Sequence, residues 1–147
     1  MRGMSNGHGI RAWARPLATA LAAAIIAAPA GAQSLKSMRA QEADEQALAR
    51  EVAYTNTVCA SSIASRIDWR ASAGWPAGAS LVDACDGALG AIEAMCRSDA
   101  GKARAQGIAT FVCAGDGAGP SISGRTFRYG ARPGVSGFRE TRDYLGE

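Results

Sequence analysis

The chain is poor in the residues that most enzymes use for catalysis. Its 147 residues include one histidine, His8, and two lysines, Lys36 and Lys102. Catalytic Ser-His-Asp and Cys-His sites need a histidine side chain beside the reacting group. Zinc and haem sites ligated by histidine need one as well. Beyond residue 32 the chain also lacks the G-x-S-x-G and S-x-x-K motifs of serine hydrolases. An enzyme built on this chain would have to use carboxylates, and we expect no cofactor.

The first thirty-two residues have the pattern of an export signal. Three arginines give a basic start, the apolar run 17–28 follows, and the triplet Ala30–Ala32 is a small-x-small cleavage site. A membrane-spanning helix needs about 20 apolar residues, so this run is too short to remain as a stable span. We predict a signal peptide at residues 1–32 and a periplasmic or secreted protein. Fourteen arginines against two lysines favour a GC-rich gene, and hence a bacterial periplasm.

Without the predicted signal peptide, the chain has no net charge and few large apolar residues. The 115 residues after position 32 carry thirteen Arg plus Lys and thirteen Asp plus Glu. Nucleic-acid-binding domains present an excess of positive charge, so we expect no nucleic-acid partner. Only eighteen of these residues are Leu, Ile, Val or Phe, which indicates that something besides apolar bulk supports the core.

Four cysteines supply that support. An even number of cysteines in a small exported domain is typical of structural disulfides. The sequence has no C-x-x-C pair and no histidine after residue 32 to complete a mixed metal site. We therefore predict two disulfides and no metal, formed by Cys59, Cys85, Cys96 and Cys113.

Helix geometry excludes one of the three possible pairings. Cys85, Leu89, Ile92 and Cys96 are spaced by four, three and four residues, as on one helical face. With a rise of 1.5 Å per residue, the Cα atoms of Cys85 and Cys96 would be about 16 Å apart, well beyond the roughly 7 Å limit of a disulfide. One remaining pairing is Cys59 with Cys85 and Cys96 with Cys113. We prefer Cys59 with Cys96 and Cys85 with Cys113, because a helix returning from a strand brings Cys96 back beside Cys59.

The order of predicted elements indicates an α+β fold. We expect a helical arm at 33–57 and a single disulfide-stapled domain at 58–147. That domain should contain a small three-stranded, mostly antiparallel sheet packed by about three to four helices. Its predicted elements are a strand in 61–69, a helix after Ser80, a helix 99–106 capped by Ser98, a hairpin of strands 108–114 and 121–129 around the turn 114–120, and a helix 138–145 capped by Ser136.

Arginines and aromatic residues alternate in the C-terminal third of the chain. Arginine beside an aromatic ring can hold a carboxylate, a phosphate or a sugar ring. Acidic residues occur among them, so local ion pairing is the alternative interpretation. We take the candidate binding residues to be Arg125, Arg128, Tyr129, Arg132 and, from the Gly/Pro/Ser-rich loop 70–80, Trp75.

Two functional hypotheses follow from these patterns. The first is a small non-enzymatic domain that binds or structurally supports a cell-envelope partner: a protein, a glycan or an anionic ligand. The alternative is a carboxylate-dependent hydrolase acting on a cell-wall glycan, which needs two carboxylates about 5 to 9 Å apart. Its candidate residues are Asp68, Asp83, Asp86 and Glu93, and no catalytic pair is assigned among them.

Overall fold

The computed structural model describes residues 30–146. The predicted signal peptide lies outside these residues, apart from residues 30–32, which fall in the first turn of a long helix. Within the described range, no helix is both long and apolar enough to cross a membrane. The elements in chain order are α1 (Ala30–Cys59), β1 (Ala64–Asp68), α2 (Leu81–Met95), α3 (Asp99–Gln106), β2 (Thr110–Ala114), β3 (Gly119–Ser123), β4 (Thr126–Gly130) and α4 (Phe138–Leu145).

The predicted α+β class is confirmed, but the predicted sheet is wrong in detail. Four strands, not three, form one mixed sheet in the order β1-β2-β4-β3. The first three strands of that order are mutually parallel, and only β3 runs antiparallel to its neighbour. The connection through α2 and α3 makes β1 and β2 parallel, because a helical crossover returns the chain to the same end of the sheet.

The predicted hairpin between 108–114 and 121–129 is wrong as well. The second segment contains a hairpin of its own, β3 and β4, with Gly124 and Arg125 at the turn. Gly124 has φ of 56°, the left-handed value that a two-residue turn needs at its first position. Because β3 takes the outer edge, β4 lies beside β2, and the turn predicted at 114–120 connects β2 to that outer strand.

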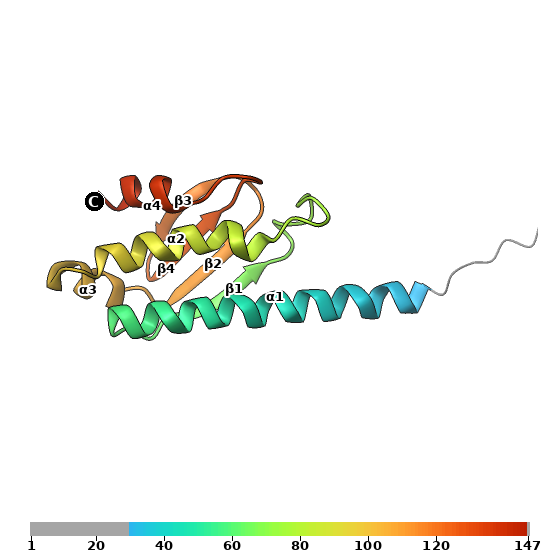
Figure 1. The fold of residues 1–147 in the computed structure, drawn as a ribbon, viewed down its shortest axis with the longest axis horizontal. Helices are drawn as coiled ribbons and strands as arrows, with labels where there is room; N and C mark the ends of the chain where they lie inside the picture. Colours follow the sequence, from blue (N-terminus) through green and yellow to red (C-terminus); the bar gives the residue numbers. More distant parts are fainter. Residues whose placement is uncertain (1–29, 147) are drawn as a thin grey trace, which may run out of the picture.

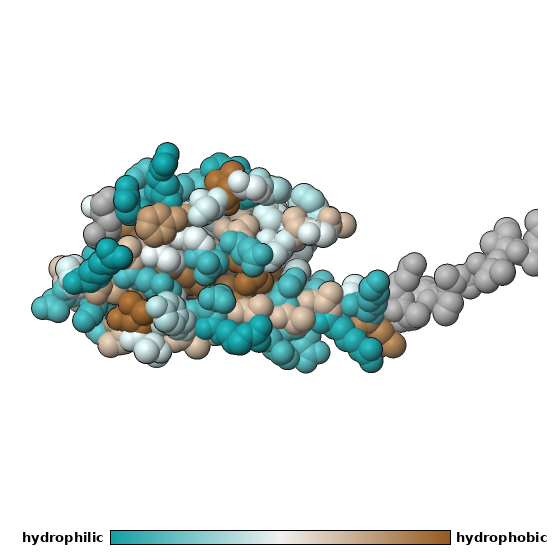
Figure 2. Space-filling view, viewed as in Figure 1, coloured by the Kyte–Doolittle hydropathy of each residue, from teal (hydrophilic) through white to brown (hydrophobic). Residues whose placement is uncertain are grey.

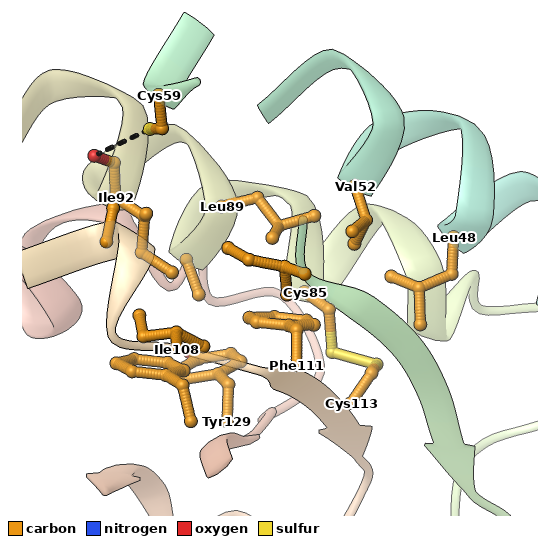
Figure 3. Packing of buried hydrophobic residues seen from close by; sticks show 14 of the residues in the cluster. Leu48, Val52, Cys59, Cys85, Leu89, Ile92, Ile108, Phe111, Cys113 and Tyr129 are labelled. Carbon is orange, nitrogen blue, oxygen red and sulfur yellow. Dashed lines mark hydrogen bonds between the residues drawn. A yellow bond between two sulfur atoms is a disulfide. The ribbon is translucent and has the colours of Figure 1, made fainter. Parts of the chain in front are cut away.

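Helix α2 lies across the sheet, with α1 along β1 and α4 along β3 (Figure 1). The side chains of Phe111, Phe127 and Tyr129 are fully buried beneath the helices. Phe111 and Phe127 are opposite each other in the parallel register, and their ring centroids are 5.8 Å apart. The Cys85–Cys113 disulfide lies beside Phe111, below α1 (Figure 3). Aromatic residues and sulfur thus supply the core volume that aliphatic residues do not.

Two disulfides fix the ends of α2. Cys59, the last residue of α1, is bonded to Cys96, with 5.2 Å between their Cα atoms. Cys85 is bonded to Cys113 in the middle of the sheet, with a Cα separation of 5.9 Å. This is the pairing preferred from the sequence, and it holds α2 to α1 at one end and to β2 near the other.

The helix termini follow the predicted caps, with one correction. Ser80 Oγ accepts a hydrogen bond from Asp83 N at 3.1 Å, and Ser98 Oγ accepts one from Gly101 N at 3.0 Å, as N-cap residues do. The predicted N-cap of α4, Ser136, is wrong by one residue, because Gly137 occupies the N-cap position. Gly137 occupies this position because a Cβ there would lie 2.5 Å from Cζ of Tyr129.

Side chains occupy backbone groups next to each edge strand of the sheet. Immediately before β1, the Asn56 side chain accepts a hydrogen bond from Ile63 N at 2.7 Å and donates one to Ile63 O at 2.9 Å, as a neighbouring strand would. On β3, Pro120 has no N–H, and Ile122 N donates to the Tyr144 hydroxyl at 3.0 Å. Such devices prevent the strand-to-strand association that open edges invite.

Candidate functional site

The structure separates the residues predicted to bind a partner. Tyr129 is fully buried, and its hydroxyl lies 3.4 Å from Glu140 Oε2. It is buried because aromatic residues and Arg128 alternate along β4, which points the aromatic residues toward the helices and the arginine away from them. Burial, followed by the Glu140 carboxylate, raises the pKa of Tyr129, so the hydroxyl stays protonated at neutral pH. Tyr129 therefore supports the core and offers no surface to a ligand.

The arginines of this region have local partners. Arg128 forms an ion pair with Asp116, and Arg132 Nη2 lies 3.1 Å from Glu140 Oε2. The hydrogen bond from Arg128 is the main reason that the pKa of Asp116 is lowered. Arg125 Nε donates to the Gly107 carbonyl at 3.2 Å. Arg128 and Arg132 therefore form local ion pairs, and the three arginine side chains do not form a shared anion-binding site.

Trp75 lines a groove beyond the carboxyl ends of β1 and β4, and none of these arginines is part of its lining. The groove has a volume of about 330 Å³ and is formed by the β1–α2 connection, the first turn of α2 and the β4–α4 connection. Parallel strands of α/β proteins commonly bind ligands beyond their carboxyl ends. We name this the Trp75 groove; its lining residues are Trp75, Ala79, Ser80, Asp83, Ala84, Gly134, Val135 and Ser136.

The Trp75 side chain is fixed without any ligand. Its Nε1–H donates to the Ala79 carbonyl at 2.9 Å, and its backbone N donates to Ser72 O at 2.9 Å. The indole packs on Gly115 so closely that a Cβ at that glycine would lie 2.8 Å from its Cε3. Ser72 Oγ also accepts a hydrogen bond from Gly115 N at 2.9 Å, which ties the loop after β1 to the end of β2. The ring is therefore held at the groove before anything binds.

The chemistry of the Trp75 groove is apolar and acidic. Val135, which is 39 % exposed, contributes an apolar wall. Asp83 and the hydroxyls of Ser80 and Ser136 supply polar atoms, and no lysine or arginine lines the groove. Such a lining favours ligands that present apolar faces and hydrogen-bond donors. Arg132 and Arg139 line adjoining hollows that share Val135 and Ser136 with the groove.

A second groove crosses the helical layer. It has a volume of about 230 Å³ and lies between the end of α1, the second half of α2 and the start of α4. Figure 2 shows this helical side of the molecule, where hydrophobic side chains are interrupted by hydrophilic ones. We name it the helix groove; its lining residues are Tyr54, Val58, Gly90, Glu93, Ala94, Arg97 and Phe138.

Glu93 supplies the carboxyl group of the helix groove lining, and its pKa is raised. Burial raises its pKa most, a hydrogen bond from Thr55 Oγ1 at 2.7 Å opposes this, and the nearby carboxylates Asp86 and Glu51 raise it further. The fully buried Thr55 hydroxyl also lies 3.2 Å from the Glu51 carbonyl. When Glu93 is ionised, the Thr55 hydroxyl has one proton for two acceptors, the Glu93 carboxylate and the Glu51 carbonyl. When Glu93 is protonated, its own O–H can donate to the Thr55 oxygen, and the Thr55 proton is then free to bond to the Glu51 carbonyl.

This arrangement predicts a pH-dependent contribution of Glu93 to stability. A carboxyl group with a raised pKa in the folded state stabilises the fold below its unfolded pKa and loses this contribution as pH rises through the folded pKa. The Glu93→Gln variant keeps an acceptor for Thr55 but cannot ionise. We expect its unfolding free energy to exceed that of the parent at pH 7 by less than about 1 kcal/mol, since solvent screens a partly buried carboxylate. Urea denaturation from pH 4 to pH 8 measures this difference, and a difference that does not change with pH would contradict the assignment.

The four candidate catalytic carboxylates do not gather in one groove, although Asp86 lies near enough to Glu93 to raise the pKa of that group. Asp68 Oδ1 accepts a hydrogen bond from Ala71 N at 3.0 Å and so stabilises the turn after β1. Asp83 lines the Trp75 groove, Glu93 lines the helix groove, and Asp86 is exposed on α2. No two of the four line the same groove, and residues 30–146 contain no group of three His, Cys, Asp or Glu placed to hold a metal.

Comparison of the chain with protein-family models, with curated proteins and with solved structures finds no match. The geometry of the two grooves is therefore the basis for assigning a function.

Proposed function

We propose that the chain is an exported, non-enzymatic domain that binds a glycan of the cell envelope through the Trp75 groove. The observation that carries this proposal is the fixed indole of Trp75, which lines the same groove as Val135 and Asp83. Sugar rings have apolar faces that stack on aromatic side chains, and their hydroxyls donate hydrogen bonds to carboxylates. The lining of the groove itself holds no lysine or arginine, which supports a neutral polyol as the group that stacks on Trp75.

The exported location is part of the proposal. Two disulfides are compatible with an oxidising compartment, where small domains use such bonds in place of a larger core. The signal-like pattern of residues 1–32 supports the same location. Cell-wall glycan is abundant in that compartment, so a groove of modest affinity would be occupied there.

The proposal predicts that Trp75→Ala loses glycan binding while the fold is retained. Purified cell-wall sacculi and their soluble muramidase fragments serve as probes, in co-sedimentation and calorimetric titration. We expect at least a tenfold loss of affinity, or about 1.4 kcal/mol, because buried aromatic contacts dominate many binding surfaces. The control is Trp69→Phe, since Trp69 donates to Glu45 and lies outside the Trp75 groove.

Two results would count against this function. The parent protein could fail to bind sacculi and fragments at millimolar concentration, or Trp75→Ala could bind them as well as the parent does. A parallel change in the Asp83→Asn variant, with Trp69→Phe unaffected, would place the ligand in the groove.

The carboxylate-dependent hydrolase remains the second candidate, and one observation favours it. Glu93 has a raised pKa within a groove, which is the property of a general acid. Release of reducing ends from sacculi that is lost in Glu93→Gln would support this reaction. Binding without release, sensitive to Trp75 and indifferent to Glu93, would support the non-enzymatic domain.

A further inference from the structure

We propose that the glycan bound at the Trp75 groove is an acidic one: the sugar ring that stacks on Trp75 carries a carboxylate on a substituent, and Arg139 binds this carboxylate. The inference rests on the proposed function, because it names the class of sugar that the Trp75 groove takes. It uses a hollow next to the groove that has no part in holding the indole.

The Trp75 groove adjoins a second hollow. This hollow has a volume of about 490 Å³ and is formed by the β4–α4 connection and the first turn of α4. We name it the Arg139 hollow; its lining residues are Gly134, Val135, Ser136, Phe138 and Arg139. The first three of these residues also line the Trp75 groove. A ligand larger than one sugar ring can therefore extend from the groove, along this shared wall, into the Arg139 hollow.

Arg139 supplies the charge of this lining, and its side chain is exposed. The arginines considered above differ from it, because Arg128 and Arg132 each form an ion pair with a nearby carboxylate. Within residues 30–146, no ion pair or side-chain hydrogen bond engages Arg139. A guanidinium binds a carboxylate through two parallel hydrogen bonds, and here it is available to do so with a ligand.

The stability of α4 gives no reason for an arginine at this position. Arg139 is the second residue of α4, and the first turn of a helix favours negative charge over positive charge. Asp143 is four residues further on, a spacing at which opposite charges on a helix can pair, but the described chain shows no ion pair between the two. A binding role accounts for a cation that neither the helix dipole nor a local partner stabilises.

The charges around the hollow match an anion with a single charge. Asp143 lines a neighbouring hollow together with Arg132, Arg139 and Glu140, and the Arg132–Glu140 ion pair balances two of these charges. Arg142 lies over the aromatic ring of the Arg139 hollow, 6.0 Å from its centroid, and adds positive charge there. The remaining charges are two cations and one carboxylate. An excess of one positive charge fits a carboxylate better than a phosphate monoester, which carries about two negative charges.

Ser136 supplies a hydrogen-bond donor where the two hollows meet. Its Oγ accepts a hydrogen bond from Phe138 N at 3.4 Å, and a hydroxyl that accepts can also donate its own proton. A sugar with a carboxylate-bearing substituent satisfies the whole surface. Its ring stacks on Trp75, its hydroxyls donate to Asp83, and its carboxylate accepts from Arg139 and Ser136.

The test compares two ligands that differ only in this charge, by NMR titration of the oxidised protein. The first is the peptide-free disaccharide of N-acetylglucosamine and N-acetylmuramic acid, whose lactyl group bears a carboxylate. The second is the methyl ester of the same disaccharide. The parent should bind the acid at least about fivefold more tightly than the ester, the size of effect that a partly exposed ion pair provides. Added salt should reduce this preference, because it screens exposed charges.

The Arg139→Gln variant should bind the acid and the ester equally, with the affinity that the parent has for the ester. Its matched control is Arg50→Gln, which removes an exposed arginine of α1 that lines neither the Trp75 groove nor the Arg139 hollow. This control should keep the full preference for the acid.

The outcomes separate this inference from glycan binding itself. If the parent binds acid and ester equally, and Trp75→Ala loses both, the carboxylate assignment is overturned while glycan binding at the Trp75 groove stands. A preference for the acid that survives in Arg139→Gln would overturn the role of Arg139. A parent that binds neither disaccharide would overturn the proposed function and this inference together.

Discussion

Replacing Cys85 and Cys113 together by alanine is expected to lower the free energy of unfolding by about 3.5 kcal/mol. Their disulfide closes a loop with a sequence separation of 28, and the chain-entropy relation for a loop of that size gives this value. Small domains have total stabilities of about 5 to 15 kcal/mol, so the loss is a large fraction of the whole. Both cysteines are also fully buried, so the smaller alanines remove contacts that the core does not replace.

Chemical denaturation of the double variant measures this loss directly. The expected change corresponds to a fall in melting temperature of roughly 15 °C or more. Removing both cysteines together avoids a free thiol that could exchange with Cys59 or Cys96. The best control is the parent protein, whose non-reduced peptide map should contain the Cys85–Cys113 link. A double variant within about 0.5 kcal/mol of the parent would show that this disulfide is not a principal source of stability.

Gly87→Ala is expected to destabilise the fold by about 1 to 3 kcal/mol, the usual effect of overpacking. A Cβ at Gly87 would lie 2.5 Å from Ser136 Oγ and 2.9 Å from the backbone N atoms of Gly137 and Phe138. Relief would require the start of α4 to move away from α2, because backbone atoms cannot rotate aside as a side chain can.

Gly90→Ala is the matched control for this variant. Gly90 lies three residues further along α2, and a Cβ there would meet only the Phe138 ring, at 3.5 Å. Both substitutions improve helix propensity equally, by up to about 1 kcal/mol. Thermal and urea unfolding should therefore show opposite signs for the two variants. Equal effects would mean that α4 does not approach α2 as closely at Gly87 as described.

The features that could be predicted from the sequence depend on nearby residues. The spacing of Cys85, Leu89, Ile92 and Cys96 indicates one helical face, and the same spacing excludes a bond between the two cysteines. Ser80 and Ser98 are N-cap residues because their hydroxyls are within reach of backbone N–H groups three positions ahead. Such relations need no knowledge of the rest of the fold.

The sheet could not be predicted in the same way. Residues 121–129 have continuous strand character, and the turn at Gly124 that divides them is supported by a single glycine. Whether β3 or β4 lies beside β2 is decided by contacts between segments distant in the chain, which local patterns do not contain. The order β1-β2-β4-β3 therefore emerges only from the assembled core.

Some residues of the candidate sites could have been placed from local sequence patterns, and others could not. The alternation of Phe127, Arg128 and Tyr129 could have revealed that the aromatic residues face the core, because side chains of a strand point to opposite faces in turn. No such signal marks Val135 or Ser136, which reach the Trp75 groove only through the path of the β4–α4 connection. Loop residues of this kind are placed by the elements around them.

The interleaving of the two disulfides determines whether the protein stays in one piece after a protease cuts its backbone. Cys59 pairs with Cys96 and Cys85 with Cys113, so the second bridge begins before the first has ended. A protease that breaks the backbone once at any point from residue 60 to residue 112 leaves both pieces joined by at least one bridge. The loop 70–80 is the natural place for such a nick, since most of its residues are exposed and surface loops attract proteases. A clipped molecule in an oxidising compartment therefore keeps its two halves at high mutual concentration, and the helix groove, which this loop does not line, can persist after the chain is cut.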